Sequence, residues 1–422
     1  MTSPPREVSR LEAPLDATVR PPGSKSETVR ALAAAALADG RSHIYSPLAA
    51  DDPMAMAGAL RGLGIMVDTA SEPWTVDGQG GRLNPPDNPI DANESGLSAR
   101  ILLAMAGSLD GISRIVGKGR LPERPMRGVV EVLRSQGVEV DSDHLPIEVA
   151  GRGHLWGGRV VVDCSESSQF ATAIMLVAPT MHEPCSLQIE GLTGSADYLE
   201  GTVSIMRRFG ASIERTTTGY EIANLGYSAS DVVIEPDASA AVYPMAIAAI
   251  TRGRVVIDGL GESSWQPDLR VAAVLGEMGC RVAWEGRRVT VDARDAELSG
   301  VDVDMSEAPD GALALAVVAL FATGPSRISG LHSLRLKESD RLRAISEEIN
   351  RLGGDAGVDD DTLIVKPVEL HGATIDPHGD HRIAMAMATA GVNVTGVRVA
   401  DPDVVNKTWP GYWTFLESLI WA

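Results

Sequence analysis

The stretch ALAAAALADG at Ala31–Gly40 is an alanine-rich apolar segment that ends at a glycine, and five similar stretches follow it. They are Ala99–Gly111, Phe170–Pro184, Ala240–Gly253, Ala312–Gly324 and Arg382–Gly391. The six end points lie 71, 73, 69, 71 and 67 residues apart. Such even spacing indicates a repeated structural unit, so it decides the fold class before any single motif is considered.

Each apolar stretch is followed by a short alternating segment of strand type, a polar loop and a second helical segment. Five of these second helices end at a glycine that is followed by another strand-like segment. A left-handed helix cap needs glycine at that place. The glycines are Gly64, Gly137, Gly210, Gly279 and Gly353. The repeat is therefore expected to be a βαβαβ-type unit.

Alanine-rich helices with few charges are expected to be buried rather than amphipathic, with the sheets outside them. A chain of 422 residues is too long for one ordinary core. We therefore predict an α/β protein built as a two-domain inside-out α/β barrel, with six repeats and three per domain. The division is expected near Pro236, and the N-terminal strand, at about residues 1–20, is expected to join the second half.

Bulk composition excludes several classes of function. The net charge of −20 argues against binding to nucleic acid or to an anionic membrane. Three cysteines without a CxxC pair argue against a disulfide framework or a zinc knuckle. The N-terminus has no apolar core of signal-peptide type, and the longest apolar run, Gly311–Ala322, is too short to span a bilayer. A cytoplasmic protein is expected.

Basic residues stand at many of the expected helix starts, where the partial positive charge of the helix disfavours them. They are Lys25, Arg30, Arg100, Arg124, Lys337, Arg341, His381, Arg382 and Lys407. Any one of them could simply be solvated or paired with a nearby carboxylate. Their recurrence in an acidic protein favours a site for a small molecule with several anionic groups, such as phosphate and carboxylate.

Three acids accompany these bases. Asp237 and Asp310 each open an apolar helix, and both are plausible helix caps. Glu338 lies between Lys337 and Arg341 and is the better candidate for a general acid or base.

The segment SESSQ adds neutral donors or a capping cluster. GSKS lacks the spacing of a P-loop, and His378 with His381 lacks a metal-ligand spacing, so no metal is expected.

Seven motifs occur in order along the chain: PPGSKS, ERPM, SSQF, EPDASA, LKESDRL, GDHRIAMAM and NKTWP. Together with the sixfold repeat they resemble the 5-enolpyruvylshikimate-3-phosphate synthase family over essentially the whole chain.

The resemblance implies domain I at 1–20 plus 238–422 and domain II at 21–237, which close on substrate about a hinge. The active site is expected in the cleft between the domains.

The resemblance also implies a reaction. The enolpyruvyl group of phosphoenolpyruvate is transferred to the 5-hydroxyl of 3-phosphoshikimate by addition and elimination, and phosphate is released. This step belongs to the shikimate pathway, which leads to chorismate and the aromatic amino acids. No cofactor or metal is expected, and the protein is expected to be a monomer that binds only these small molecules.

Site residues follow by matching the family's motifs. The expected catalytic residues are Lys25, Asp310 and Glu338, with Asp310 as proton acceptor and Glu338 as proton donor. The residues expected to bind 3-phosphoshikimate are Lys25, Ser26, Arg30, Ser167, Ser168, Ser195, Tyr198, Asp310, Ser333 and Lys337. Those expected to bind phosphoenolpyruvate are Lys25, Gly96, Arg124, Gln169, Arg341, Arg382 and Lys407.

The chain departs from the family pattern at Glu94, where an asparagine that contacts the substrate phosphate is usual. Asn93 lies one position too early to replace it. Val29 also replaces a usual asparagine, and Ser333 stands where some relatives have one. A carboxylate beside a phosphate repels it, so Glu94 is expected to weaken phosphoenolpyruvate or glyphosate-type binding, or to mark a different acceptor.

Three other functions remain open at this point. The first is a sister enolpyruvyltransferase that acts on a UDP-linked amino sugar, which the absence of cysteine from Gly117–Arg124 disfavours. The second is a non-catalytic anion-binding paralogue, which the retained acids and bases disfavour. The third is an enolpyruvyltransferase of a secondary pathway with a different hydroxylated acceptor.

Overall fold

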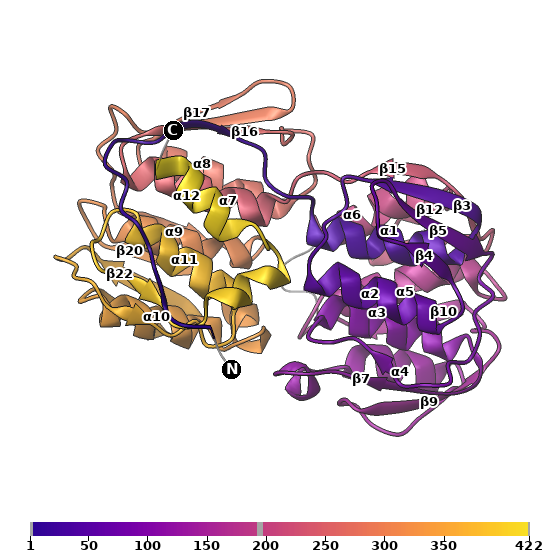
Figure 1. The fold of residues 1–422 in the computed structure, drawn as a ribbon. Coiled ribbons are helices and arrows are strands. Elements are labelled where there is room, and N and C mark those ends of the chain that lie inside the picture. The colour runs from indigo at the N-terminus through magenta and orange to yellow at the C-terminus, as the bar shows by residue number, and fades with distance from the viewer. Residues whose placement is uncertain (1–2, 192–196, 421–422) are drawn as a thin grey trace. The chain divides into compact units, whose positions relative to one another are not determined.

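The computed structural model describes residues 3–191 and 197–420. The chain forms two compact units, which we call unit 1 (Met1–Pro22 with Pro236–Ala422) and unit 2 (Gly23–Glu235). Each unit has one hydrophobic core of its own. Figure 1 shows the elements of both units, which are described separately below.

Three buried helices form the centre of each unit. In unit 2 they are α1 (Lys25–Leu37), α3 (Gly96–Gly107) and α5 (Gln169–Val177). In unit 1 they are α7 (Ala238–Ile250), α9 (Ala312–Ala319) and α11 (His381–Gly391). Within each unit the three pack against one another, which small alanine side chains allow at close range.

The second helix of each repeat is buried on one face and exposed on the other. In unit 2 these helices are α2 (Asp51–Gly62), α4 (Arg127–Ser135) and α6 (Asp197–Arg208). In unit 1 they are α8 (Arg270–Glu277), α10 (Arg341–Arg351) and α12 (Tyr412–Ile420). Among the described residues, none of the helices is both long and apolar enough to cross a membrane.

The described residues form six small sheets, three in each unit, and their strands alternate buried and exposed residues. In unit 2 the first sheet contains β3 (Ala38–Tyr45), β4 (Met66–Asp68), β5 (Trp74–Gln79), β14 (Tyr227–Ser228) and β15 (Asp231–Val233). The second sheet contains β6 (Ile90–Asp91), β7 (Asp110–Val116), β8 (Glu139–Val140) and β9 (Ile147–Arg152). The third sheet contains β10 (Gly158–Asp163), β11 (Cys185–Glu190), β12 (Ile213–Arg215) and β13 (Gly219–Ile222).

The sheets of unit 1 follow the same plan. Their strands are β2 (Asp16–Val19), β16 (Arg254–Asp258), β17 (Arg281–Trp284) and β18 (Arg288–Asp292); β19 (Asp302–Asp304), β20 (Ser326–Ser329), β21 (Asp355–Asp359) and β22 (Thr362–Lys366); and β1 (Arg6–Glu7), β23 (Thr374–Ile375) and β24 (Arg398–Val399).

The predicted fold class is confirmed: this is an α/β protein of buried alanine-rich helices with sheets outside them. The repeat has one strand more than the expected pattern. After the second helix of the first five repeats comes a hairpin, as in β12 and β13, and the later strand of the hairpin lies inside the sheet. The five glycines that end the second helices all have positive φ, as predicted.

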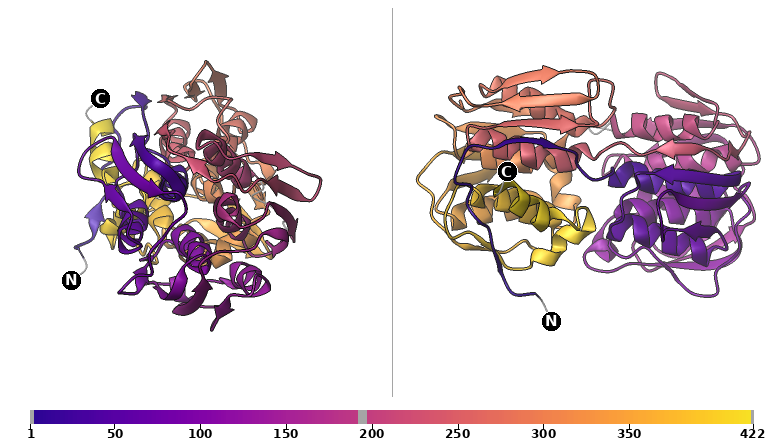
Figure 2. Two further views of the ribbon diagram at one scale, coloured as in Figure 1. Left: turned by 90° about the vertical axis from the view of Figure 1, so that its right-hand side faces the viewer. Right: turned by 45° about the horizontal axis from the view of Figure 1, so that its top comes forward.

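The first repeat of each unit borrows a strand from a distant part of the chain. β15 pairs in parallel with β3 in unit 2, and β2 pairs in parallel with β16 in unit 1. The N-terminal segment therefore lies along the unit made by residues 236–422, as Figure 2 shows in indigo. The chain passes from one unit to the other twice, at Pro22–Gly23 and at Glu235–Pro236.

The docking of β2 depends on a glycine. A Cβ atom on Gly253 would lie 2.3 Å from the Leu15 carbonyl oxygen and 2.5 Å from the Leu15 nitrogen. Gly253→Ala is therefore expected to displace the strand and to lower the free energy of unfolding by about 2 kcal/mol. Urea denaturation measures this loss.

Gly276→Ala is the matched control, because its Cβ would meet only Val282 Cγ2 at 3.5 Å, an ordinary contact. Its place within α8 predicts a stabilisation of up to about 1 kcal/mol. Equal urea midpoints for the two variants would contradict the assigned role of Gly253.

Candidate functional site

The most highly charged cluster of unit 1 centres on Asp310, in the short 3₁₀ helix η4 (Pro309–Gly311) that precedes α9. Its Oδ1 lies 2.9 Å from Arg341 Nη1 and 3.5 Å from Lys337 Nζ, and its Oδ2 lies 3.1 Å from Arg382 Nη2. One carboxylate thus faces three cations from three elements of the fold.

Arg341, the first residue of α10, holds the cluster together. Its side chain is 1% exposed, and its Nε donates to Asp380 Oδ2 at 2.7 Å. Its two terminal nitrogens donate to Asp310 and, at 2.7 Å, to Glu338 Oε2. A single guanidinium therefore fixes both of the acids that were expected to be catalytic.

Asp380 connects this guanidinium to the next helix start. Its Oδ1 accepts a hydrogen bond from the Arg382 backbone nitrogen at 2.9 Å, which caps α11. Its Oδ2 also accepts from the Ser339 hydroxyl at 3.1 Å. Asp380 thereby sets the backbone that carries Arg382.

The cluster shifts the pKa values of its members. Burial alone would raise the pKa of Asp310, but Arg382, Lys337 and Arg341 outweigh burial and hold that pKa well below its usual range. Burial would lower the pKa of Arg382, but Asp310 and other nearby acids hold it above the usual value. Asp310 and Arg382 are therefore both charged at neutral pH.

Lys407 completes the set in unit 1. It ends the 3₁₀ helix η6 (Pro402–Lys407), is 5% exposed, and places Nζ 4.0 Å from Glu338 Oε1. Ser333, in the 3₁₀ helix η5 (His332–Leu336), is half-buried. Within the described part of the chain its side chain joins none of these contacts.

In unit 2, Lys25 is the first residue of α1, and Ser24 caps this helix. The Lys25 Nζ lies 3.2 Å from Asp52 Oδ2, in the first turn of α2. A buried carboxylate therefore forms an ion pair with this lysine, just as carboxylates of unit 1 form ion pairs with the cations there.

Arg30 lies one turn further along α1 and is also 1% exposed, but its partners are neutral. Its Nε donates to Thr202 Oγ1 at 2.9 Å, and its terminal nitrogens donate to Ser26 and to the Tyr198 carbonyl. Burial lowers the pKa of Arg30 to about 10, so it stays protonated at neutral pH.

The starts of α3 and α5 are joined by Arg100, whose Nη1 donates to Gln169 Oε1 at 2.5 Å. Arg100 Nη2 donates to the Pro125 carbonyl at 2.8 Å, next to Arg124. Arg124 packs on Gly96, because a Cβ atom at that glycine would lie 2.6 Å from Arg124 Cζ. Gly96 therefore leaves room for the guanidinium.

The structure brings the predicted residues together in two groups. Those of unit 1 are Asp310, Lys337, Glu338, Arg341, Arg382 and Lys407. Those of unit 2 are Lys25, Ser26, Arg30, Gly96, Arg124, Ser167, Ser168, Gln169 and Tyr198, all at or near the starts of α1, α3, α5 and α6. Ser195 lies outside the described residues.

Of the two acids that were plausible helix caps, Asp237 and Asp310, the structure shows a cap at Asp237 alone. The Asp237 carboxylate caps α7 by accepting from Ala240 N at 3.1 Å, as predicted. Asp310 is not a cap, because neither η4 nor α9 has a side-chain cap bond among the described residues. The carboxylate oxygens of Asp310 form ion pairs with the surrounding cations instead.

Asp52 and Asp380 were missed as site residues, although both stand at helix starts, where acids are favoured. The position of Asp380 directly before His381 and Arg382 was the available signal. In the described residues, no group of three His, Cys, Asp or Glu side chains could hold a metal ion.

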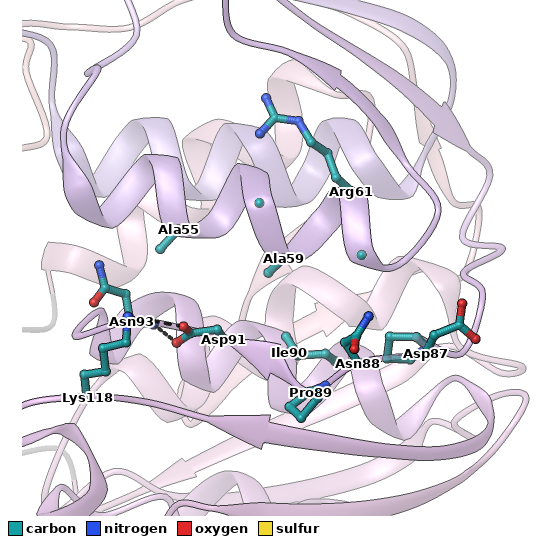
Figure 3. A pocket seen from close by; sticks show the side chains of 13 residues that line it. Ala55, Ala59, Arg61, Asp87, Asn88, Pro89, Ile90, Asp91, Asn93 and Lys118 are labelled. Carbon is teal, nitrogen blue, oxygen red and sulfur yellow. Dashed lines mark hydrogen bonds and ion pairs between the residues drawn. The ribbon is translucent and has the colours of Figure 1, made fainter.

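A separate pocket of about 610 Å³ lies between α2 and the segment Pro86–Asp91 in unit 2. Figure 3 shows Asn93 and Lys118 at one end of it, where Asp91 accepts a hydrogen bond from the Asn93 backbone nitrogen and forms an ion pair with Lys118. Asn93 therefore lines this pocket. Glu94 packs on the next loop, since a Cβ atom at Gly119 would lie 2.6 Å from Glu94 Oε1.

The chain is similar to known proteins over nearly its whole length. The family model described as EPSP synthase (3-phosphoshikimate 1-carboxyvinyltransferase) matches residues 10–416. The chain belongs to this family.

A 3-phosphoshikimate 1-carboxyvinyltransferase of Methanoculleus marisnigri is 38% identical over 96% of both chains, and one of Pseudoalteromonas translucida is 35% identical over 98% of this chain and 99% of that one. The solved EPSP synthase of Acinetobacter baumannii shares the fold, with a TM-score of 0.81 and 23% identity over 99% of this chain and 98% of that one.

Asp310→Asn tests the electrostatics of the cluster. A carboxyl group whose pKa is lower in the folded than in the unfolded protein stabilises the folded state at pH values above 3.8, its usual pKa. This stabilisation is lost as the pH falls through the pKa of the folded state. The variant is expected to lose roughly 3 kcal/mol of unfolding free energy, constant from about pH 5 to about pH 8 and shrinking below about pH 4.

Urea denaturation over this pH range measures the difference. Asp295→Asn is the control, because its 79% exposed carboxylate pairs with the exposed Arg281. A difference of zero at neutral pH, or one that persists unchanged to about pH 3, would contradict the assigned charge state.

Proposed function

We propose that this protein transfers the enolpyruvyl group of phosphoenolpyruvate to the 5-hydroxyl of 3-phosphoshikimate and releases phosphate. Family membership over nearly the whole chain supports this, as do the names of the relatives. The observation that carries the proposal is the pair of acids, Asp310 and Glu338, fixed by Arg341 beside two further cations. Acids for proton transfer and cations for anionic substrates then occur in one cluster.

The acids take opposite roles in the first step. Glu338 donates a proton to the methylene carbon of phosphoenolpyruvate, while Asp310 accepts the proton of the attacking hydroxyl, whose oxygen bonds to the central carbon. In the second step Glu338 takes a proton back from the new methyl carbon, the carbon–oxygen bond to phosphate breaks, and phosphate departs. The double bond is restored, and the hydroxyl proton leaves with phosphate or solvent.

Substrate anions would also activate Asp310. While three cations face its carboxylate, Asp310 is a weak base. A substrate carboxylate or phosphate that binds Arg382 and Lys337 neutralises part of that charge, and the proton affinity of Asp310 then rises. Asp310 therefore gains basicity only when substrate is bound.

The helix starts of unit 2 supply the other ligands in this proposal. Arg124, Gln169 and Gly96 would contact phosphoenolpyruvate, and Lys25 both substrates. Those for 3-phosphoshikimate would be Ser26, Arg30, Ser167, Ser168, Ser195 and Tyr198, with Ser333 and Lys337 from unit 1. Arg30 suits such a role because its side chain is hydrogen-bonded to neutral oxygens, and a buried cation is stabilised by an anion.

A phosphate-release assay tests the function directly. We expect release only when phosphoenolpyruvate and 3-phosphoshikimate are both present. Glu338→Gln is expected to lower kcat by about 10²- to 10⁴-fold, the usual contribution of a general acid. Glu347→Gln, on helix α10 that follows Glu338 and 48% exposed, is the control that keeps its activity.

Release without 3-phosphoshikimate, or no release with it, would contradict the proposed acceptor. A Glu338→Gln variant as active as the Glu347→Gln control would contradict the proposed proton donor.

Glu94 is expected to weaken the binding of phosphoenolpyruvate, because it places a carboxylate on the segment just before α3, two residues before Gly96 and beside Gly119. Glu94→Asn should lower the KM for phosphoenolpyruvate by roughly tenfold, with the KM for 3-phosphoshikimate unchanged. Initial rates at varied phosphoenolpyruvate measure this. Glu123→Gln, at a 73% exposed position, is the control, and an unchanged KM in Glu94→Asn would refute the role.

A further inference from the structure

Asp268 is a buried acid in unit 1 that has no part in the mechanism above. It lies in the 3₁₀ helix η3 (Pro267–Leu269) directly before α8, and it is 2% exposed. Its Oδ2 accepts a hydrogen bond from the hydroxyl of Ser239, in the first turn of α7. A buried carboxylate is costly, so its retention here needs an explanation.

Neighbouring contacts hold the loop of Asp268 in place. Gln266 accepts from the Ala238 backbone nitrogen at 3.0 Å and donates to the Pro236 carbonyl at 2.8 Å. The loop is therefore fixed at the start of α7 from both sides, and Asp268 has little freedom to turn away.

The same carboxylate packs against the turn that carries Asp310. A Cβ atom at Gly311 would lie 3.5 Å from Asp268 Oδ1 and 2.5 Å from Val271 Cγ2. Gly311 follows Asp310 directly in η4, so the absence of a side chain there lets η3 and η4 pack together. The carboxylate of Asp268 therefore lies against the turn that carries Asp310.

The surrounding charges act on Asp268 in both directions. Burial and the charge of Asp310 raise its pKa, Arg382 and the Ser239 hydroxyl oppose this rise, and the resulting pKa is about 6. Asp237, the cap of α7, adds a smaller repulsion. Of the other groups nearby, Arg270 at the start of α8 is exposed, and Tyr243 on α7 is a neutral phenol because burial raises its pKa to about 12.

We propose that Asp268, given the function proposed above, is a positioning residue for proton transfer: packed against the turn of Gly311, its negative charge keeps the neighbouring Asp310 carboxylate basic. Two negative charges close together repel each other, so each binds a proton more readily than it would alone. When Asp268 is neutral, this repulsion is lost, and Asp310 becomes a weaker base.

This arrangement predicts the direction of the pH dependence. Asp268 is ionised above about pH 6 and protonated below it. Activity should therefore fall as the pH drops through this range, because the protonated Asp268 no longer repels negative charge on Asp310. Removing the Ser239 hydroxyl takes away a hydrogen bond that favours the ionised form, so the fall should then begin at a higher pH.

The test is the pH profile of kcat for phosphate release at saturating phosphoenolpyruvate and 3-phosphoshikimate, from about pH 5 to about pH 9. Asp268→Asn is expected to lower kcat at neutral pH by roughly tenfold and to remove the ionisation near pH 6. Ser239→Ala is expected to keep this ionisation and to move it upward. Asp302→Asn, at a 77% exposed position on β19, is the control with an unchanged profile.

The outcomes distinguish a role of Asp268 in proton transfer from a purely structural role. A purely structural role for Asp268 would lower kcat in Asp268→Asn without changing the shape of the profile, and would overturn the proposal. An unshifted profile in Ser239→Ala would also overturn it, and this variant keeps the test open if Asp268→Asn does not fold. Absence of phosphate release by the wild-type protein at every pH would instead contradict the proposed function itself.

Discussion

The guanidinium of Arg341 contacts three carboxylates, and the arrangement of unit 1 around its charged cluster depends on it. Through Asp380 it fixes the start of α11, through Asp310 the turn before α9, and through Glu338 the segment before its own helix. Because all of these groups are buried or nearly so, water cannot replace any of the contacts. Loss of one partner leaves a buried charge without compensation, which typically costs several kcal/mol.

Both units place cations at helix starts, where a positive charge is unfavourable, and both neutralise them in part. Carboxylates do this for Arg382 and Lys25, whereas Arg30 is surrounded by neutral oxygens. These cations are thus fixed and desolvated before any anionic substrate arrives, so little ordering is needed on binding. The sixfold repeat explains why such helix starts recur at regular intervals along the chain.

The fold was largely predictable, because regular spacing and the five cap glycines are local signals. The extra strand of each hairpin was not, since a segment such as β13 (Gly219–Ile222) has too few residues to stand out by periodicity. In the site, the bases and Glu338 were predictable from motifs. Asp380 and Asp268 were not, because their roles arise from contacts with Arg341 and Ser239, 39 and 29 residues away in sequence.

The proposed mechanism depends on an exchange of ion-pair partners. Substrate anions replace Asp310 as the partners of Arg382 and Lys337, while Arg341 keeps its contacts with Asp380 and Glu338. A crystal structure of the protein with phosphoenolpyruvate and 3-phosphoshikimate bound measures this exchange most directly. We predict substrate oxygens on Arg382 and Lys337, an Asp310 oxygen facing the 5-hydroxyl, and unchanged Arg341 contacts. The account is contradicted if Arg382 stays 3.1 Å from Asp310 and the substrates contact neither cation.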